Sequence, residues 1–265
     1  MTAPSQGQGG PAPERAESKT VAPDAKASRD AAYWAKNISR LTVREAPAEA
    51  INLNVTGRRV TSPIQGFGKM WQKIYRARLP GTGVSPEKII EGWKENFPAF
   101  WPEGNRFYGP LTGIAPGETA LLNLSMPGGV KLSTGVLVLY ADDDSFTFMT
   151  PEGHMFSGWI TFSAFEEGGD PVAEARILMR ASDPLMELGL AMGGHRKEDE
   201  FWQATLRSVA AHFGAPYAEV TKEIVCVDRR RQWSRAKNVW QSSAIRSGMY
   251  APVALVSRPF RQRRH

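Results

Sequence analysis

A histidine and an aspartate in the segment "MGGHRKEDEFW" have the spacing that acid–base chemistry would use. A helix through this segment places His195 and Asp199 on one face, because four residues make about one turn. A carboxylate one turn away can orient an imidazole and raise its basicity, as general acid–base catalysis requires. The alternative is that His195 and Asp199 only interrupt the apolar face of this helix, where they are exposed to water or paired with Arg196 or Lys197. A histidine and an aspartate at this spacing are common by chance.

Motifs for other chemistry are weak in this sequence. The candidate nitrogen and oxygen ligands for a metal are His154, His195, Glu198, Asp199 and His212, and their spacing matches no helical metal motif. The glycine runs fit neither a phosphate-binding loop nor a dinucleotide fingerprint, and no Gly-x-Ser-x-Gly elbow is present. His154 follows the turn "PEG" and is expected to bond nearby backbone. We therefore expect neither a metal nor a cofactor.

Aromatic residues alternate with small polar residues in "SFTFMTPEGHMFSGWITFSAF", Ser145 to Phe165. This alternation predicts a β-hairpin with one apolar face. The face could pack on a helix as core, which is the ordinary fate of large apolar residues. It could instead line a hollow.

The elements around this hairpin follow from periodicity and turn chemistry. A strand is expected at Gly68–Leu79, and a helix starts at the N-cap Ser85 and ends near Pro98. Five strands follow with short turns between them, which indicates an antiparallel meander. They are predicted at 118–126, 132–141, 145–150, 156–165 and 172–182. In the last of them alanine, isoleucine and methionine share one side, so one face of the sheet is dry and the other wet.

A long amphipathic helix is predicted after the meander. Asp183 caps it, Pro184 starts it and Gly214 ends it. Apolar residues recur at helical spacing at Leu185, Leu188, Met192, Trp202, Leu206, Val209 and Phe213. Gly193 and Gly194 interrupt the middle and allow a bend or a close approach to the sheet. An antiparallel sheet with one apolar face must be covered, and this helix is the element large enough to cover it.

The order of elements resembles the helix-grip fold of the SRPBCC superfamily, which includes START-type lipid-transfer domains, the birch-pollen-allergen family and polyketide cyclase/dehydrase-like proteins. The resemblance covers roughly residues 60–214 and rests on that order together with "GHMFSGWITFSAFEE" and "GGHRKEDEFW". "QGFGKMWQKIYRARL" and "FPAFWPEGNRFYGPLTGIAPGE" are similar to uncharacterised bacterial members. The resemblance implies an α+β fold, a curved antiparallel sheet wrapped around a long C-terminal helix, and a hydrophobic cavity. It implies no universal catalytic residues.

In such a fold the aromatic face of the hairpin lies on the concave side of the sheet. Apolar walls with few polar groups are typical of ligand cavities. The residues predicted to line the cavity are Phe146, Phe148, Ile160, Phe162, Ile177 and Met192. The alternative for any one of these aromatic residues is packing against the long helix.

Charge is concentrated at the C-terminus. Residues 229–265 contain ten Lys or Arg and no acid, and removing these ten from the total of 33 leaves 23 basic against 27 acidic residues in 1–228. A helical stripe of Trp233, Ala236, Trp240, Ala244 and Gly248 lies opposite basic residues. The stripe suits docking on the domain or contact with an anionic membrane surface, and nucleic acid is a less favoured partner.

Composition divides the chain and sets its class. The expected parts are a disordered segment at 1–30, an extension at 31–59, the helix-grip domain at 60–216 and a basic extension with an amphipathic helix at 217–265. Three features favour a cytoplasmic protein: Cys226 is the lone cysteine, no signal peptide is found, and no apolar run reaches about 18–20 residues. Peripheral membrane contact is an option.

Three functions follow from these features. The first is binding of a small apolar or amphipathic ligand, lipid-like or polyketide-like, in the cavity. The second is an enzyme of the cyclase/dehydrase or hydrolase type that uses His195 with Asp199. The third is a membrane-associated interaction protein. The sequence leaves the ligand and the oligomeric state open.

Overall fold

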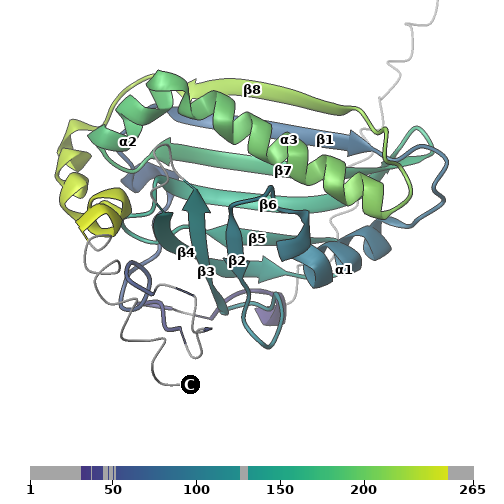
Figure 1. Cartoon of the computed structure of the whole chain (residues 1–265), viewed down its shortest axis with the longest axis horizontal. Helices are drawn as coiled ribbons and strands as arrows, with labels where there is room; N and C mark the ends of the chain where they lie inside the picture. The colour runs from purple at the N-terminus through teal and green to yellow at the C-terminus, as the bar shows by residue number, and fades with distance from the viewer. Residues whose placement is uncertain are drawn as a thin grey trace, which may run out of the picture. The chain divides into compact units, whose positions relative to one another are not determined.

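The computed structural model describes residues 31–36, 38–43, 47, 50, 52–125 and 131–249. Within them, eight strands form one antiparallel sheet in the order β2-β3-β4-β5-β6-β7-β1-β8 (Figure 1). The strands are β1 (Met70–Arg78), β2 (Arg106–Tyr108), β3 (Thr119–Ser125), β4 (Lys131–Ala141), β5 (Ser145–Met149), β6 (Phe156–Glu167), β7 (Asp170–Ala181) and β8 (Val220–Asp228). The predictions for 1–30 and 250–265 lie outside the described residues.

The helices are α1 (Pro86–Asn96), α2 (Pro184–Gly189) and α3 (His195–His212), with a π-helical turn, Leu190–Gly194, between the last two. The predicted caps of α1 and α2 are present. Ser85 accepts a hydrogen bond from the amide of Lys88, and Asp183 accepts one from the amide of Met186. Each of these two helices begins with a proline, whose missing N–H costs nothing at that position.

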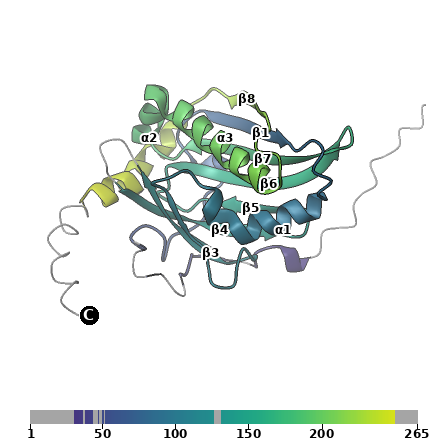
Figure 2. The same ribbon diagram turned by 45° about the vertical axis from the view of Figure 1, so that its right-hand side comes forward.

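Both α1 and α3 lie across the same face of the sheet (Figures 1 and 2). This is the α+β helix-grip fold that the sequence and its resemblance to the SRPBCC superfamily predicted. Strands β2 and β8 were not predicted. Strand β8 pairs with β1 from Met70 to Ala77, so the sheet continues beyond residue 216, where the sequence-based domain ended.

One end of the covered face is filled by aromatic side chains. Trp93 of α1 is fully buried, with ring centroids 6.1 Å from Phe146 and 5.1 Å from Phe162. Phe146 and Phe162 stack on each other at 4.7 Å, and Phe97 lies 5.2 Å from Phe162. The end of the sheet under α1 is therefore ordinary close-packed core.

The other face is covered at β3 and β4 by the N-terminal extension. Leu41 and Val55 of the extension form a second buried cluster with Leu121 and Leu137 of the sheet. The approach is so close that a Cβ on Gly135 would lie 2.8 Å from a methyl group of Val55. Both faces of β3 and β4 are therefore covered, and the two strands are buried at nearly every position and not at alternate positions.

The C-terminal extension is attached to the domain by hydrogen bonds. A 3-10 helix, Trp233–Gln241, is followed by a short helix at 243–249. The side-chain amide of Asn238 donates to the carbonyls of Gln65 and Ser182, each at 2.9 Å, and the amide of Ser243 donates to Gly153 at 2.7 Å. Trp233 also packs edge-on against Phe67, with ring centroids 5.3 Å apart. Both tryptophans nevertheless stay largely exposed, Trp233 at 74% and Trp240 at 82%.

Candidate functional site

A cavity of about 510 Å³ lies between the sheet and the helical segment that follows β7. Its walls are mainly apolar, and a few polar side chains interrupt them. The sheet contributes Leu122, Leu124, Val136, Phe148, Phe156, Ile160, Ile177 and Met179, and the helical segment contributes Met186, Leu190, Met192, Phe201 and Trp202. The polar lining residues are Asn105, Ser125, Thr150, His154, Lys197 and Glu198.

The hollow exists because α1 covers only part of the concave face. Along β6 the residues of one parity divide into two groups. Phe156, Gly158 and Ile160 line the cavity, whereas Phe162 packs in the core under Trp93. The same division occurs along α3, whose N-terminal half faces the cavity and whose C-terminal half is buried in the core.

Four of the six residues predicted to line the cavity do so: Phe148, Ile160, Ile177 and Met192. Phe146 and Phe162 do not. They are fully buried in the aromatic cluster, because Trp93 occupies the space in front of them. The alternative of core packing holds for these two residues.

The predicted single helix from Pro184 to Gly214 is broken at the cavity. Gly193 has a φ of +107°, in the left-handed region that favours glycine, and α2 is therefore rotated relative to α3. Leu185 and Leu188, predicted to face the sheet with Met192, are exposed. Glu187 is buried in their place and accepts a hydrogen bond from Arg231 at 2.9 Å. Met192 borders the cavity but is itself 77% exposed.

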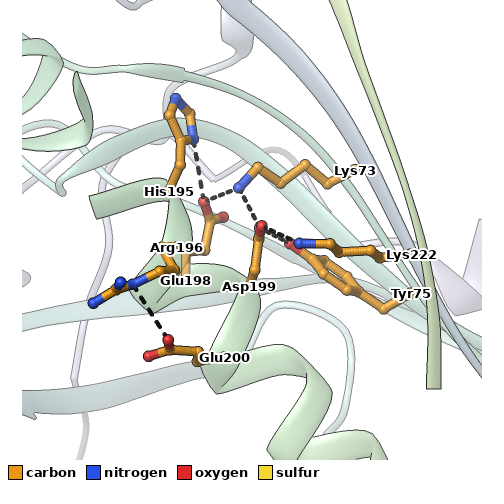
Figure 3. Close-up of polar contacts among 8 residues, drawn as sticks. All are labelled: Lys73, Tyr75, His195, Arg196, Glu198, Asp199, Glu200 and Lys222. Atoms are coloured by element: carbon orange, nitrogen blue, oxygen red, sulfur yellow. Dashed lines mark hydrogen bonds and ion pairs between the residues drawn. The ribbon is translucent and has the colours of Figure 1, made fainter. Parts of the chain in front are cut away.

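A cluster of charged side chains borders the cavity (Figure 3). Lys73 of β1 is fully buried, and its ammonium group donates to Glu198 Oε2 at 2.8 Å and to Asp199 Oδ1 at 2.7 Å. The hydroxyl of Tyr75 also donates to Asp199 Oδ1, at 2.7 Å. Lys222 of β8 donates to Asp199 Oδ2 at 3.0 Å. The buried Lys73 and the half-exposed Lys222 thus balance two buried carboxylates.

The environments of these two carboxylates push their pKa values apart. Burial raises the pKa of Glu198 to about 7, against the attraction of Lys73. Burial also opposes the ionisation of Asp199, but hydrogen bonds from Lys73, Tyr75 and Lys222 outweigh it and lower its pKa. Asp199 is therefore ionised at neutral pH, and Glu198 is close to the midpoint of its titration.

His195 does not pair with Asp199 as the spacing predicted. Its ring packs edge-on against Trp71 with centroids 4.9 Å apart, and Nδ1 lies 4.0 Å from Glu198 Oε2. The carboxylate of Asp199 is bonded to lysines and a tyrosine instead. Burial and the nearby Lys73 lower the pKa of His195, and the residue does not line the cavity.

His154, in the turn between β5 and β6, has the backbone contact expected of it. Its Nδ1 accepts a hydrogen bond from the amide of Phe156 at 3.0 Å. Burial lowers its pKa to about 4, so the imidazole that borders the cavity is neutral at pH 7. A neutral ring keeps this part of the wall uncharged.

Two members of the charged cluster, Lys73 and Glu198, were not predicted as site residues. Lys73 has the same parity as Trp71 and Tyr75 in the predicted strand, so the alternation of large apolar residues contained a signal for a buried lysine. Glu198 directly precedes Asp199 and was considered only as a metal ligand. Among the described residues, no group of three or more His, Cys, Asp or Glu side chains is placed to hold a metal ion.

Comparisons with known proteins concern the fold. No family model and no curated protein matches the chain. Solved structures similar to it include TTHA0849 from Thermus thermophilus, at 15% identity over 55% of this chain and 99% of that chain, with a TM-score of 0.43. The di-domain ARO/CYC StfQ of the steffimycin biosynthetic pathway is 13% identical over 54% of this chain and 50% of that chain, with a TM-score of 0.42. Major latex-like protein 151 from Panax ginseng is 18% identical over 56% of this chain and 99% of that chain, with a TM-score of 0.38.

Proposed function

We propose that this protein binds a small apolar or amphipathic molecule in the cavity between its sheet and α3. The observation that supports this most is the cavity itself, about 510 Å³ with mainly apolar walls. Small-molecule sites usually have volumes of about 300–1,000 Å³ and the same composition. Apolar side chains that face a void lose their dispersion contacts, so an occupant of matching shape would stabilise the fold.

The first test is native mass spectrometry of the purified full chain. A bound molecule would appear as added mass that disappears on denaturation. In parallel, the fluorescent probe 1-anilinonaphthalene-8-sulfonate is expected to bind the wild type and to bind the variant Ile160→Trp about tenfold more weakly, because the larger indole occupies part of the space that the probe needs.

The matched control for this experiment is Leu111→Trp, which places the same side chain at an exposed position. Cooperative thermal unfolding of each variant shows that it is folded. Equal probe binding by Ile160→Trp and the wild type would contradict the proposal.

An enzyme that uses His195 with Asp199 stays a prediction. The contacts of these residues favour it less than binding, because Asp199 is held by Lys73, Tyr75 and Lys222. His195 is also outside the cavity lining.

We further propose that the C-terminal extension holds the protein at an anionic membrane surface. Trp233 and Trp240 are exposed, as are Leu185 and Leu188 of α2, which contacts the 3-10 helix. The same C-terminal extension also carries exposed basic side chains: Arg229, Arg230, Arg231, Lys237 and Arg246. Indole rings beside cationic groups suit the boundary between water and an anionic lipid layer. No helix among the described residues is long and apolar enough to span a bilayer.

Sedimentation with vesicles tests this second proposal. The full chain is expected to pellet with phosphatidylserine-containing vesicles, much less with pure phosphatidylcholine, and less at high salt. The variant Trp233→Ser/Trp240→Ser is expected to lose most of the binding. Its matched control is Trp34→Ser, an exposed tryptophan in the N-terminal extension. Equal recovery of the double variant and the wild type with the anionic vesicles would refute the proposal.

A further inference from the structure

We propose that Glu198 receives the polar end of the bound molecule, and that this end is a neutral hydrogen-bond donor such as a hydroxyl group. The inference rests on the proposed function, since it assigns a chemical class to the ligand of the same cavity. Lys73 and Asp199 act in it as positioning residues.

The geometry of Glu198 supports this assignment. The residue lines the cavity, and its side chain is only 7% exposed. Oε2 accepts the hydrogen bond from Lys73, whereas Oε1 makes no hydrogen bond with any described residue. Oε1 is not among the fully buried atoms that lack a partner, so a molecule in the cavity can reach it. A hydroxyl donor from a ligand would there replace a hydrogen bond from water.

The orientation of Glu198 is held by the residues behind it. Lys73 is fully buried and bonds both Glu198 and Asp199, so its ammonium group cannot turn away without losing an ion pair. Tyr75 and Lys222 in turn fix Asp199 (Figure 3). A carboxylate positioned in this way makes a directional acceptor, because no reorganisation is required when the ligand binds.

The charge balance selects a neutral ligand. Above pH 7, where both carboxylates are mostly ionised, Glu198 and Asp199 cancel the charges of Lys73 and Lys222. A bound ammonium or carboxylate would therefore add an unbalanced charge to a mainly apolar cavity, which is unfavourable. Lys197 also borders the cavity, but it is exposed and remains hydrated. A hydroxyl group donates to Glu198 without adding charge.

The preference of the cavity for a ligand with a hydrogen-bond donor is expected to depend on pH. The pKa of Glu198, raised by burial to about 7, makes it an acceptor above that pH and a protonated carboxyl below it. The preference for a donor should therefore grow as the pH rises through 7. The titratable and charged groups that face Glu198 or its partners are Lys73 and Tyr75 of β1, His195, Lys197 and Asp199 of α3, Lys222 of β8 and His154 of the β5–β6 turn.

Two probes of matched shape test the inference on the full chain. 2-Naphthol carries a hydroxyl donor, and 2-methoxynaphthalene has the same rings without the donor. Isothermal titration at pH 8 is expected to show 2-naphthol binding the wild type about tenfold more tightly, the usual effect of one hydrogen bond to a charged group. In Glu198→Gln this preference should disappear, because an amide that accepts from Lys73 through its oxygen presents N–H groups to the cavity.

The matched control is Glu200→Gln, the same change at an exposed position of α3, which should keep the preference. If the wild type binds both probes equally, or if Glu198→Gln keeps the preference, the inference is overturned while the proposed function stands. Tighter binding of 2-naphthoate or of 2-naphthylmethylamine than of 2-naphthol would also overturn it. Failure of the wild type to bind either probe would count against the proposed function and, with it, this inference. The wild-type comparison decides the matter even if Glu198→Gln fails to fold.

Discussion

Replacing Lys73 with methionine is expected to lower the free energy of unfolding by about 3–5 kcal/mol, the usual cost of removing one partner from a buried ion pair. Methionine keeps the apolar length of the side chain but removes the ammonium group. Glu198 and Asp199 would then face each other in the interior without the cation that bonds both of them. Urea denaturation at pH 8, followed by circular dichroism, measures the loss.

The control for this change is Lys88→Met on α1. Lys88 forms an ion pair with Glu91 in which both side chains are exposed, and such pairs contribute little to stability. The loss in Lys73→Met should also be smaller at pH 6 than at pH 8, because Glu198 is then largely protonated and only Asp199 is left without its cation. A loss below about 1 kcal/mol at pH 8 would show that the cluster is not held as the contacts indicate.

Truncating Phe162 to alanine is expected to cost about 3–5 kcal/mol of unfolding free energy, the range for large-to-small changes of a phenylalanine in a packed core. Phe162 is fully buried, and its ring contacts those of Trp93, Phe97 and Phe146. Loss of the ring would leave a void among the packed aromatic side chains of the core. Denaturation curves of the variant and the wild type measure the loss.

The matched comparison is Ile160→Ala, two residues earlier on the same face of β6. Ile160 is only partly buried and lines the cavity, so its truncation enlarges an existing space and should cost clearly less. For binding of the fluorescent probe the two variants should rank the other way, and Ile160→Ala should change the affinity more than Phe162→Ala. Similar losses of stability in the two variants would contradict the division of β6 into a core half and a cavity half.

Most of the strands and both well-capped helices were predictable because their signals are local. Alternation in "SFTFMT" and "FSGWITFSAF" reports which residues share a face, and Ser85 and Asp183 mark helix starts through bonds to amides three residues away. Strand β8 carries no such signal. It lies at the edge of the sheet and is largely exposed, so its residues show no clear apolar face.

The candidate site was predictable only in part. Spacing on a helix placed His195 and Asp199 together, yet Lys73, one of the three residues that bond Asp199, lies 126 residues away in the sequence. No local pattern reports such a contact. Alternation in β1 places Lys73 on the same side as Trp71 and Tyr75, but it does not report which carboxylates Lys73 meets, since that depends on how α3 crosses the sheet.

The sequence by itself determined that this chain forms a meander of antiparallel strands with one apolar face, and that a helical segment after it must cover that face. These features follow from side-chain periodicity and from caps and turns, which act over a few residues. Only the tertiary structure decided which part of the covered face is core and which part is hollow. Strand periodicity cannot separate Ile160 from Phe162, because both side chains point the same way from β6. The difference arises when Trp93 of α1 fills the space before Phe162 and leaves the space before Ile160 open.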